Sequence, residues 1–536
     1  MKKLKLVCVA IAMAGAAPTF AGGLLTNTNQ HVAFNRMMSR EASIGIDGVY
    51  YNPAGVVFMG DGHHLAINWQ LAYQTRTINN DYKLFTNNVN NPITPRDFKG
   101  KAFAPVIPSF QYAYNKGKWS FQANFSLTGG GGKCTFDDGL GSFEKIVSET
   151  AIAACGLAGV VDQTLGNTLG QQGMEMFTSD QAFGKTGKYS FNSYMHGRQY
   201  YYGLSAGAAY KFCDNFSAFL GVRGVYALTN YYGYVENINV GNMPLYKVLD
   251  PTKENAANIE LSCDQTGVGF TPIIGVDYKT GRWNFSAKYE FKTRIRLKNK
   301  SVNQTPSIGN LPANLANQMT GILTARYQQA GLPLEQAKQQ AENTTNTVLS
   351  DPKVGATMMG LKTQFDQKLN KAIGEYEDGK KIAGDIPAYL ALGIGYSPVD
   401  AVRVNVGFHW FDDKNATSYN NRNKELKRGT LEYNAGVEVD VNKKITLSTG
   451  WQNTNYGLSD EYMDDKSFVV SSNSAAIGGV YHINKKMDLN VAYFHTFYQH
   501  KKTSETVQLA ADKSVVYNSD YTRNNNVFAV GLDINF

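Results

Sequence analysis

Histidine is the residue type of this chain best suited to acid–base chemistry, and the sequence contains eight histidines. His196, His409, His495 and His500 could each serve as a general base in the hydrolysis of a lipid or a peptide. Hydrolysis also requires a nucleophile and an orienting group, and no pattern in the sequence pairs these with any of the four. We therefore interpret them as structural histidines and predict no catalytic residue and no enzyme, with a membrane lipase or protease as an alternative.

The cysteines do not form a metal-binding pattern. Those that follow residue 21 are Cys134, Cys155, Cys213 and Cys263, and no CxxC or Cys/His spacing among them suggests zinc. They are also too few for a disulfide framework in a chain of 536 residues. We interpret them as isolated thiols or as a single disulfide, and we predict no metal site.

Two further motifs bear on haem ligation and on phosphate binding. His31, His63 and His64 could ligate the iron of a haem, which leaves a haemin or porphyrin receptor as an alternative function. The glycine run TGGGGKC, residues 128–134, is not a phosphate-binding loop, because Leu127 and Cys134 stand where that motif requires Gly and Ser or Thr. We therefore predict no cofactor.

The first residues form a secretory signal peptide. Three lysines precede an apolar block over residues 6–17, and Thr19-Phe20-Ala21 provides the cleavage site, so we expect cleavage after Ala21. The formal charge then falls from +8 by three lysines to +5, which is modest and dispersed, and no nucleic-acid partner is predicted. No later run of about 18 apolar residues predicts a transmembrane helix.

The alternation of side chains predicts strands that cross a membrane. In KWSFQANFSLT, residues 118–128, apolar residues occupy every second position and polar residues occupy the positions between. The same period recurs in residues 64–75 and 401–410, where Arg403 falls on the polar face. A tilted strand needs about 9 to 11 residues to cross hydrocarbon, and these segments have that length.

The lengths of the connections predict a closed barrel. Short links near residues 115–118, 211–215, 279–282, 397–401, 441–444 and 483–486 alternate with seven long insertions, near residues 79–102, 129–195, 235–262, 298–385, 411–429, 455–467 and 500–520. Thirteen links of this kind join about fourteen antiparallel strands with both chain ends on one side. The fold class is therefore all-β, a transmembrane barrel over residues 64–536. The last strand alternates up to the aromatic Phe536, which is typical of the signal for the barrel-assembly machinery.

The long insertions near 129–195 and 298–385 carry helical periodicity and are predicted to be extracellular helices. In the insertion near 298–385 apolar residues recur at helical spacing. These residues either pack loop helices over the barrel mouth or form a candidate surface for capture of a hydrophobic ligand: Leu315, Met319, Ile322, Met358, Leu361 and Phe365.

A segment of about 40 residues, 22–63, precedes the first strand and belongs to no sheet. Asn52, Pro53, Ala54 and Gly55 fit a type I turn, because Pro presets the second turn position while Asn and Gly suit the first and fourth. A segment directly before a barrel and too short to be a domain is predicted to fold inward as a plug.

At this point the sequence resembles the FadL family, which moves long-chain fatty acids and aromatic hydrocarbons across bacterial outer membranes. The resemblance is carried by AFNRMMSREASIGIDGVYYNPAGV (33–56), DIPAYLALGIGYSP (385–398) and LSTGWQNTNYGLS (447–459). It implies a fourteen-stranded barrel plugged by an amino-terminal hatch, capture of substrate among outer helices, and sideways exit through a kink in the third strand. Gly129, Gly130, Gly131 and Gly132, at the predicted end of that strand, are the candidate lateral gate.

The predicted function is passive, ligand-gated transport of hydrophobic small molecules similar to long-chain fatty acids. The predicted partners are such a ligand, outer-membrane lipid with lipopolysaccharide, and the assembly machinery, and the chain is predicted to be a monomer in the bacterial outer membrane. A general porin is an alternative, whereas an energy-coupled receptor is excluded because about 40 residues cannot form its plug domain.

Overall fold

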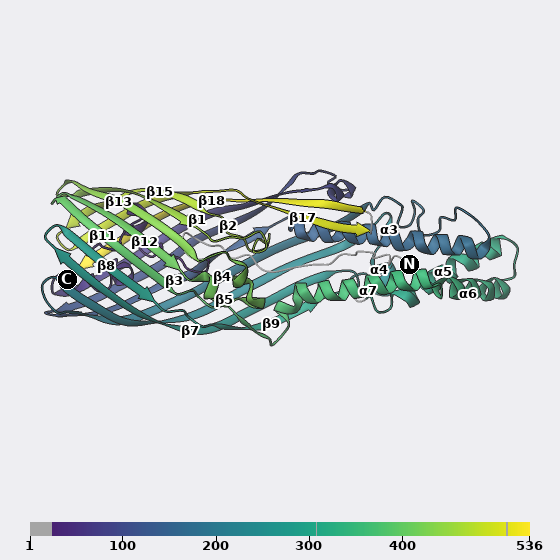
Figure 1. Cartoon of the computed structure of the whole chain (residues 1–536), viewed down its shortest axis with the longest axis horizontal. Coiled ribbons are helices and arrows are strands. Elements are labelled where there is room, and N and C mark those ends of the chain that lie inside the picture. The colour runs from purple at the N-terminus through teal and green to yellow at the C-terminus, as the bar shows by residue number, and fades with distance from the viewer. Residues whose placement is uncertain (1–23, 307, 511–512) are drawn as a thin grey trace.

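The chain forms a closed antiparallel β-barrel with a bundle of helices at one end (Figure 1). The computed structural model describes residues 24–306, 308–510 and 513–536, with the side chains of residues 364–373 and of residue 510 left out of the description. The predicted signal peptide, residues 1–21, lies outside the described residues. The first strand pairs with the last from His64 opposite Asn535 to Tyr82 opposite Tyr517, so the wall has no open edge.

Fourteen strands make the wall, and three of them are interrupted so that each is built from two labelled pieces. This confirms the predicted fold class and the predicted number of strands. In chain order the strands are β1 (Gly62–Tyr82), β2 (Arg96–Lys116), β3 (Trp119–Phe136), β4 (Tyr189–Lys211), β5 (Phe216–Val240), β7 (Ile259–Thr280), β8 with β9 (Trp283–Glu290 and Arg296–Gln304), β10 with β11 (Lys381–Ala383 and Tyr389–Val399), β12 (Val402–Phe411), β13 (Thr430–Asn442), β14 (Ile445–Asn455), β15 (Ser472–Asn484), β16 with β17 (Met487–Tyr498 and Lys501–Ala510) and β18 (Lys513–Asn535).

The helices fall into two groups, a few short ones before the first strand and several long ones in the loops. The long loop helices gather at one end of the barrel (Figure 1). The helices are α1 (Val32–Met37), α2 (Gly48–Tyr51), α3 (Gly141–Leu169), α4 (Tyr246–Leu249), α5 (Leu311–Gln329), α6 (Leu334–Leu349) and α7 (Pro352–Ile373), with 3₁₀ turns η1 (Gly55–Phe58), η2 (Lys83–Asn87), η3 (Gly374–Tyr376), η4 (Asp413–Asn415) and η5 (Tyr419–Glu425) and a two-residue strand β6 (Met243–Pro244).

The alternation of the sequence becomes the two faces of the wall. On β1, Ile67 and Trp69 are each 42% exposed on the outside, while the neighbouring Asn68 and Gln70 are buried inside. Arg403 follows the same rule on β12, where its guanidinium faces inward and pairs with Asp440. The outside is therefore apolar and the inside polar, as a barrel in lipid requires.

The strands continue beyond the apolar outer band, into segments for which the sequence predicted loops. β1 ends at Tyr82 and β3 at Phe136, and the predicted loop over residues 500–520 contains β17 and the start of β18. In these extensions the outward positions of β1 are polar, from Thr75 to Asp81. The contrast between apolar and polar positions, which marks a strand in the sequence, is lost there although the pairing continues.

Helix α3 is long and apolar enough to cross a membrane by length and composition, with a mean hydropathy of 1.2, and it is the one such helix among the described residues. Here it lies among the loop helices (Figure 1), and its side chains Phe143, Val147, Val161 and Leu165 belong to the core that these helices form. Its apolar character is therefore used in packing the loops.

Residues 24–61, which we call the hatch, lie inside the barrel. Every residue from Thr26 to Ser43 is buried, and α1 packs against β13 to β16 and against β18 and β1. The predicted turn is present, with the Gly55 N–H donating to the Asn52 carbonyl at 3.0 Å. The hatch thus fills the polar lumen that the inward side chains enclose.

Two glycines of the wall give α1 the space it occupies. Gly436 on β13 and Gly450 on β14 are paired in register, and a Cβ atom on either would overlap the carbonyl of Met37 at the end of α1. The hatch backbone therefore reaches the wall only because these positions carry no side chain.

We expect Gly450→Val to displace the end of α1 and to lower the free energy of unfolding by about 2 kcal/mol, the usual cost of overpacking. Thermal unfolding of the detergent-solubilised protein measures this change. Gly224→Val is the matched control, because the nearest atom to a Cβ at Gly224 lies 3.7 Å away. Equal stability of the two variants would contradict the assigned contact.

Candidate functional site

The turn of the hatch is bound by polar side chains from three strands. Asn52 donates to the Asp277 carboxylate of β7 at 2.6 Å. The carbonyls of Pro53 and Ala54 accept hydrogen bonds at 2.7 Å, from Gln122 of β3 and Ser217 of β5 respectively. The structure therefore brings the predicted hatch residues together with the barrel wall, and it supplies partners that the sequence analysis did not name.

A buried histidine ties the hatch to the wall a few residues earlier in the chain. His409 of β12 lies between Glu41 of the hatch and Glu432 of β13, with each ring nitrogen 2.8 Å from a carboxylate oxygen. Both ring nitrogens must donate for both contacts to be hydrogen bonds, so the geometry is that of an imidazolium. His409 is thus a structural residue, as interpreted from the sequence.

Further ionic contacts surround this histidine and hold the hatch. Lys288 donates to the Tyr50 carbonyl at 2.6 Å and to Glu290 at 2.9 Å, and Arg223 forms a two-pronged contact with the same Glu290. Lys288, Arg223 and Glu290 therefore each have an opposite charge beside them, which is the condition for keeping ions inside a protein.

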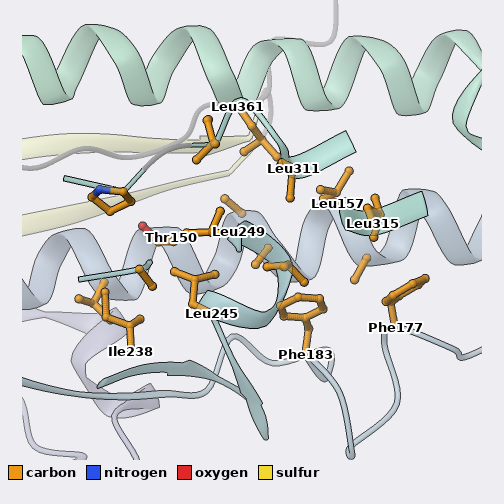
Figure 2. Close-up of a pocket in the computed structure, with 18 of the residues that line it drawn as sticks. Thr150, Leu157, Phe177, Phe183, Ile238, Leu245, Leu249, Leu311, Leu315 and Leu361 are labelled. Carbon is orange, nitrogen blue, oxygen red and sulfur yellow. The ribbon is translucent and has the colours of Figure 1, made fainter. Parts of the chain in front are cut away.

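The helical end of the molecule contains an apolar pocket, which we call the outer pocket (Figure 2). Its empty space is about 1030 Å³, part of which is open to solvent, and nearly all of its lining side chains are aliphatic or aromatic. Figure 2 shows Leu157, Phe183, Leu249, Leu315 and Leu361 approaching the cavity from separate helices and loops. The lining comes from α3, the loop after it, the end of β5, the α4 region, α5 and α7: Ile146, Val147, Thr150, Ala153, Ala154, Leu157, Ala158, Val161, Phe177, Phe183, Ile238, Leu245, Val248, Leu249, Ala257, Ile259, Pro306, Ile308, Leu311, Leu315 and Leu361.

The predicted capture residues take different positions around this pocket. Leu315 and Leu361 line it. Met319 is buried in the core beneath it and Met358 packs against that core, whereas Ile322 is 45% exposed. The side chain of Phe365 lies outside the described residues. Most of the lining comes from α3 and from the loops around residues 177–183 and 245–257, which the sequence analysis did not assign.

A second cavity, the inner pocket, lies where the first hatch residues meet the loops. Its empty space is about 1110 Å³, part of which is open to solvent, and it is bordered by Leu24 and Leu25, by Tyr201 and Tyr231 of the wall, and by loop residues that include Arg422. The sequence analysis missed this pocket, because its residues come from segments far apart in the chain.

Two carboxylates of the inner pocket lie in the loops and are shifted toward the protonated form. Burial raises the pKa of Glu375 to about 7, against the opposing effect of Lys466 and Arg422. Burial likewise raises the pKa of Asp413 to about 6, although this carboxylate accepts hydrogen bonds from the backbone N–H groups of Leu24 and Thr430. The start of the hatch is therefore bonded to an ionisable group of the pocket.

The wall beside the inner pocket is interrupted between β2 and β3. The pairing stops at Phe110 opposite Phe125 and resumes at Phe103 opposite Lys133, so six residues of β2 and seven of β3 between these pairs lack a partner across the ladder. Pro105 and Pro108 fall in this part of β2 and have no N–H to donate. We call this interruption the wall gap.

The hatch bonds to the backbone that the wall gap leaves free. Asn27 donates from its backbone to the Thr128 carbonyl at 2.9 Å and from its side chain to the Gly130 carbonyl at 2.8 Å. Gln30 donates to the Leu127 carbonyl at 2.8 Å. Donors of the hatch thus replace the missing strand partners, which backbone groups inside a membrane wall require.

The four glycines lie within this gap and not at the end of the strand. The sequence analysis placed Gly129–Gly132 at the upper end of the third strand, but β3 continues to Phe136. The glycines form two bulges against β4, and Gly130 and Gly131 have φ angles of 72° and 125°, which side chains other than glycine rarely adopt. A Cβ on Gly129 would overlap the Leu25 carbonyl, so the hatch meets the wall at this position.

The remaining histidines and the cysteines have ordinary surroundings. His31 lies 3.2 Å from Asp533, His63 stacks on Tyr114, and His64 bonds to Asn535, none of them beside either pocket lining. His196, His495 and His500 bond to Asn230, Asn526 and Asp520 respectively. The thiols of Cys134, Cys155, Cys213 and Cys263 are free, which resolves the alternatives of the sequence analysis.

The fold is a barrel that contains a hatch, has a gap in its wall and carries an apolar pocket at its outer end. Solved structures of similar fold are known. A FadL homologue from Pseudomonas aeruginosa is similar over 96% of this chain and 100% of its own, with 13% identity and a TM-score of 0.58. A TodX deltaS2S3 mutant, a monoaromatic hydrocarbon channel, is similar over 94% and 99%, with 13% identity and a TM-score of 0.50.

No family model and no curated protein sequence matches the chain. The likeness to solved structures is therefore one of fold. At this level it confirms the resemblance to the FadL family noted in the sequence.

We expect the stability of the chain to fall as pH rises from about 4.5 toward 7 because of Glu375. Its raised pKa means that the folded chain binds this proton more tightly than the unfolded chain, so the stabilisation is present at low pH and is lost through this window. Glu375→Gln should remove about 1–2 kcal/mol of this dependence. Thermal midpoints at pH 5 and pH 8 measure it, with the exposed Glu377→Gln as control. An identical pH profile in both variants would contradict the assignment.

Proposed function

We propose that this protein is a passive outer-membrane channel that takes up hydrophobic small molecules and releases them sideways into the membrane. The observation that carries the proposal is the combination of a filled lumen with a broken wall. The hatch occupies the barrel interior, while the ladder between β2 and β3 is open beside the start of the hatch. A molecule that enters from the helical end thus has a way out through the wall, whereas the hatch stands in the way along the axis.

The route has three stages in this proposal. The outer pocket takes the ligand from water or from lipid at the cell surface. The inner pocket receives it next, because this cavity lies between the loops and the first hatch residues. The wall gap releases it, since Leu25 borders the inner pocket and its carbonyl faces Gly129 in the gap.

The energy for uptake comes from the ligand itself. Each methylene group that leaves water gains about 0.8 kcal/mol, so an apolar pocket can extract an acyl chain or an aromatic ring without metabolic energy. Release into the hydrocarbon of the membrane keeps this gain, whereas passage down a wet pore would lose it. The described P. aeruginosa homologue and the monoaromatic hydrocarbon channel support ligands of this class.

The start of the hatch is the gate in this proposal. Leu24 is held by a hydrogen bond to Asp413, and Asn27 is held by hydrogen bonds to carbonyls of β3. The later part of the hatch is held by buried ion pairs. A ligand in the inner pocket that displaces Leu24 and Leu25 would therefore open the wall gap and leave the rest of the hatch in place.

The location in the outer membrane follows from the wall. Apolar and aromatic side chains cover the outside, and the last strand closes on the first, where the backbones of His63 and Phe536 exchange hydrogen bonds at 2.8 and 2.9 Å. We propose export by the signal peptide, insertion by the assembly machinery through the strand that ends at Phe536, and function as a monomer.

We expect Gly132→Phe to block release at the wall gap, because a side chain at this position would point at Ala104 across the gap, 3.4 Å from the Cβ. Transfer of an apolar ligand into proteoliposomes should fall at least about tenfold. Gly224→Phe, which faces lipid on β5, is the control. Unchanged transfer would refute sideways exit, and a large steady ion conductance of the parent protein in planar bilayers would favour a general porin.

We expect Leu361→Asp to weaken ligand binding to the outer pocket by about tenfold or more, because an apolar ligand would bury the new carboxylate. The control is Met359→Asp on the same helix, since Met359 is 73% exposed and does not line the pocket. Titration with an uncharged fluorescent probe such as N-phenylnaphthylamine measures the affinity. Equal affinity in both variants would exclude the outer pocket as the capture site.

A further inference from the structure

A cluster of cations, Lys101, Lys133 and Arg198, lies on the outer surface of the barrel across β2, β3 and β4. Lys133 and Arg198 are paired directly in register, and Lys133 is also paired with Phe103, two residues from Lys101 on the same strand face. Lys101 and Lys133 are exposed, and Arg198 is half-buried. We call these three residues the basic cluster.

The basic cluster lacks acidic partners. None of its members forms an ion pair within 4.0 Å in the described part of the chain. On β2, Asp97 is already engaged with Lys99 at 3.3 Å, and two strands beyond Arg198 the Asp264 carboxylate of β7 accepts a hydrogen bond from Asn230 at 2.8 Å. The Nε of Arg198 is buried without a hydrogen-bond partner. Like charges placed directly opposite each other in a sheet are destabilising, so the cluster calls for an external anion.

The height of the cluster on the wall identifies the kind of anion. Beside Lys133, on the same outward face, lies Phe103, which is 54% exposed. Further down β4 the stacked Tyr200 and Tyr202 follow Arg198 and lead to Leu204, which is 63% exposed and belongs to the apolar band. Aromatic side chains mark the boundary between hydrocarbon and headgroups in a barrel, so the cluster lies at the level of the headgroups.

We propose that the basic cluster binds the phosphorylated head of an outer-leaflet lipid, namely the lipid A part of lipopolysaccharide. The inference rests on the outer-membrane location proposed above. Three cations side by side match a headgroup with two phosphates, while the apolar and aromatic residues below would contact its acyl chains. A protein ligand would have to enter the headgroup layer to reach this surface, whereas a lipid is already there.

The bound lipid would lie at the upper edge of the wall gap. The pair of Phe103 and Lys133 is the first ladder pair above the gap, and Lys133 directly follows Gly132. The acyl chains of a lipid held at Lys133 would therefore extend down the outside of the gap. The lipid A site and the proposed exit share one face of the barrel.

The test compares three variants with the parent, each as the full chain in detergent micelles, titrated with bisphosphorylated lipid A and followed by native mass spectrometry. Replacing the cluster by Lys101→Gln, Lys133→Gln and Arg198→Gln should weaken binding by about a hundredfold, at roughly fivefold for each lost cation. Lys116→Gln, Lys118→Gln and Lys443→Gln, on the opposite rim, remove the same charge and should leave binding unchanged. The charge-preserving variant Lys101→Arg, Lys133→Arg and Arg198→Lys should retain lipid A binding. This result would show that the outer surface tolerates substitution.

Lipid A stripped of its phosphates should bind all forms weakly. Parental affinity in the cluster variant, equal binding of the dephosphorylated lipid, or displacement of lipid A by millimolar inorganic phosphate would each overturn the proposal. This titration measures lipid A binding and does not depend on uptake of a hydrophobic ligand. A chain that binds lipid A but carries no hydrophobic ligand would refute the proposed function alone, and a chain that carries ligand without binding lipid A would refute this inference alone.

Discussion

Backbone hydrogen bonding inside a lipid-facing wall is the constraint on which this structure depends. Every N–H and C=O group of a membrane-spanning strand needs a partner, because hydrocarbon offers none. The ladders of the wall are interrupted between β7 and the strand made of β8 and β9, and also beside the start of the hatch, between β2 and β3. There the prolines of β2 and the glycines of β3 prevent pairing, and Asn27 and Gln30 of the hatch supply donors to the carbonyls of β3. The hatch and the wall gap therefore depend on each other, because the hatch supplies hydrogen-bond donors to the backbone that the gap leaves without strand partners.

The buried ionic contacts of the hatch lie in its later part and not in its first residues. Glu41 reaches His409, Arg40 reaches Asp47 and Glu438, and Asn52 reaches Asp277, all with the side chains buried. Breaking one partner of such a buried pair costs about 3–5 kcal/mol. The residues from Leu24 to Gln30 have hydrogen bonds without comparable ionic contacts among the described residues. The later part of the hatch is therefore held more strongly than its beginning, which lies next to both the inner pocket and the wall gap.

The sequence predicted the fold well because the signals of a barrel are local. A period of two, six short turns and a terminal aromatic residue are each visible within about a dozen residues, and together they predicted the closed wall of fourteen strands. The strand extensions were not predicted, because the outward positions of β1 beyond Thr75 are polar. The site was predicted only in part. Leu315 and Leu361 lie at the outer pocket, but Tyr201, Asp413 and Arg422 meet at the inner pocket from separate segments, and no local pattern links them.

The closure of β1 on β18 also has a consequence for how the molecule forms. Val32 of the hatch packs against Ala492 and Ala529, residues of the last part of the chain, and Arg36 bonds to Asn490. These partners are separated from the hatch by more than 450 residues, so they exist only when almost the whole chain is in place. Once β18 pairs with β1, the closed wall of the barrel surrounds α1. The contacts that hold α1 to the last strands can therefore form only late, after nearly the whole chain is in place.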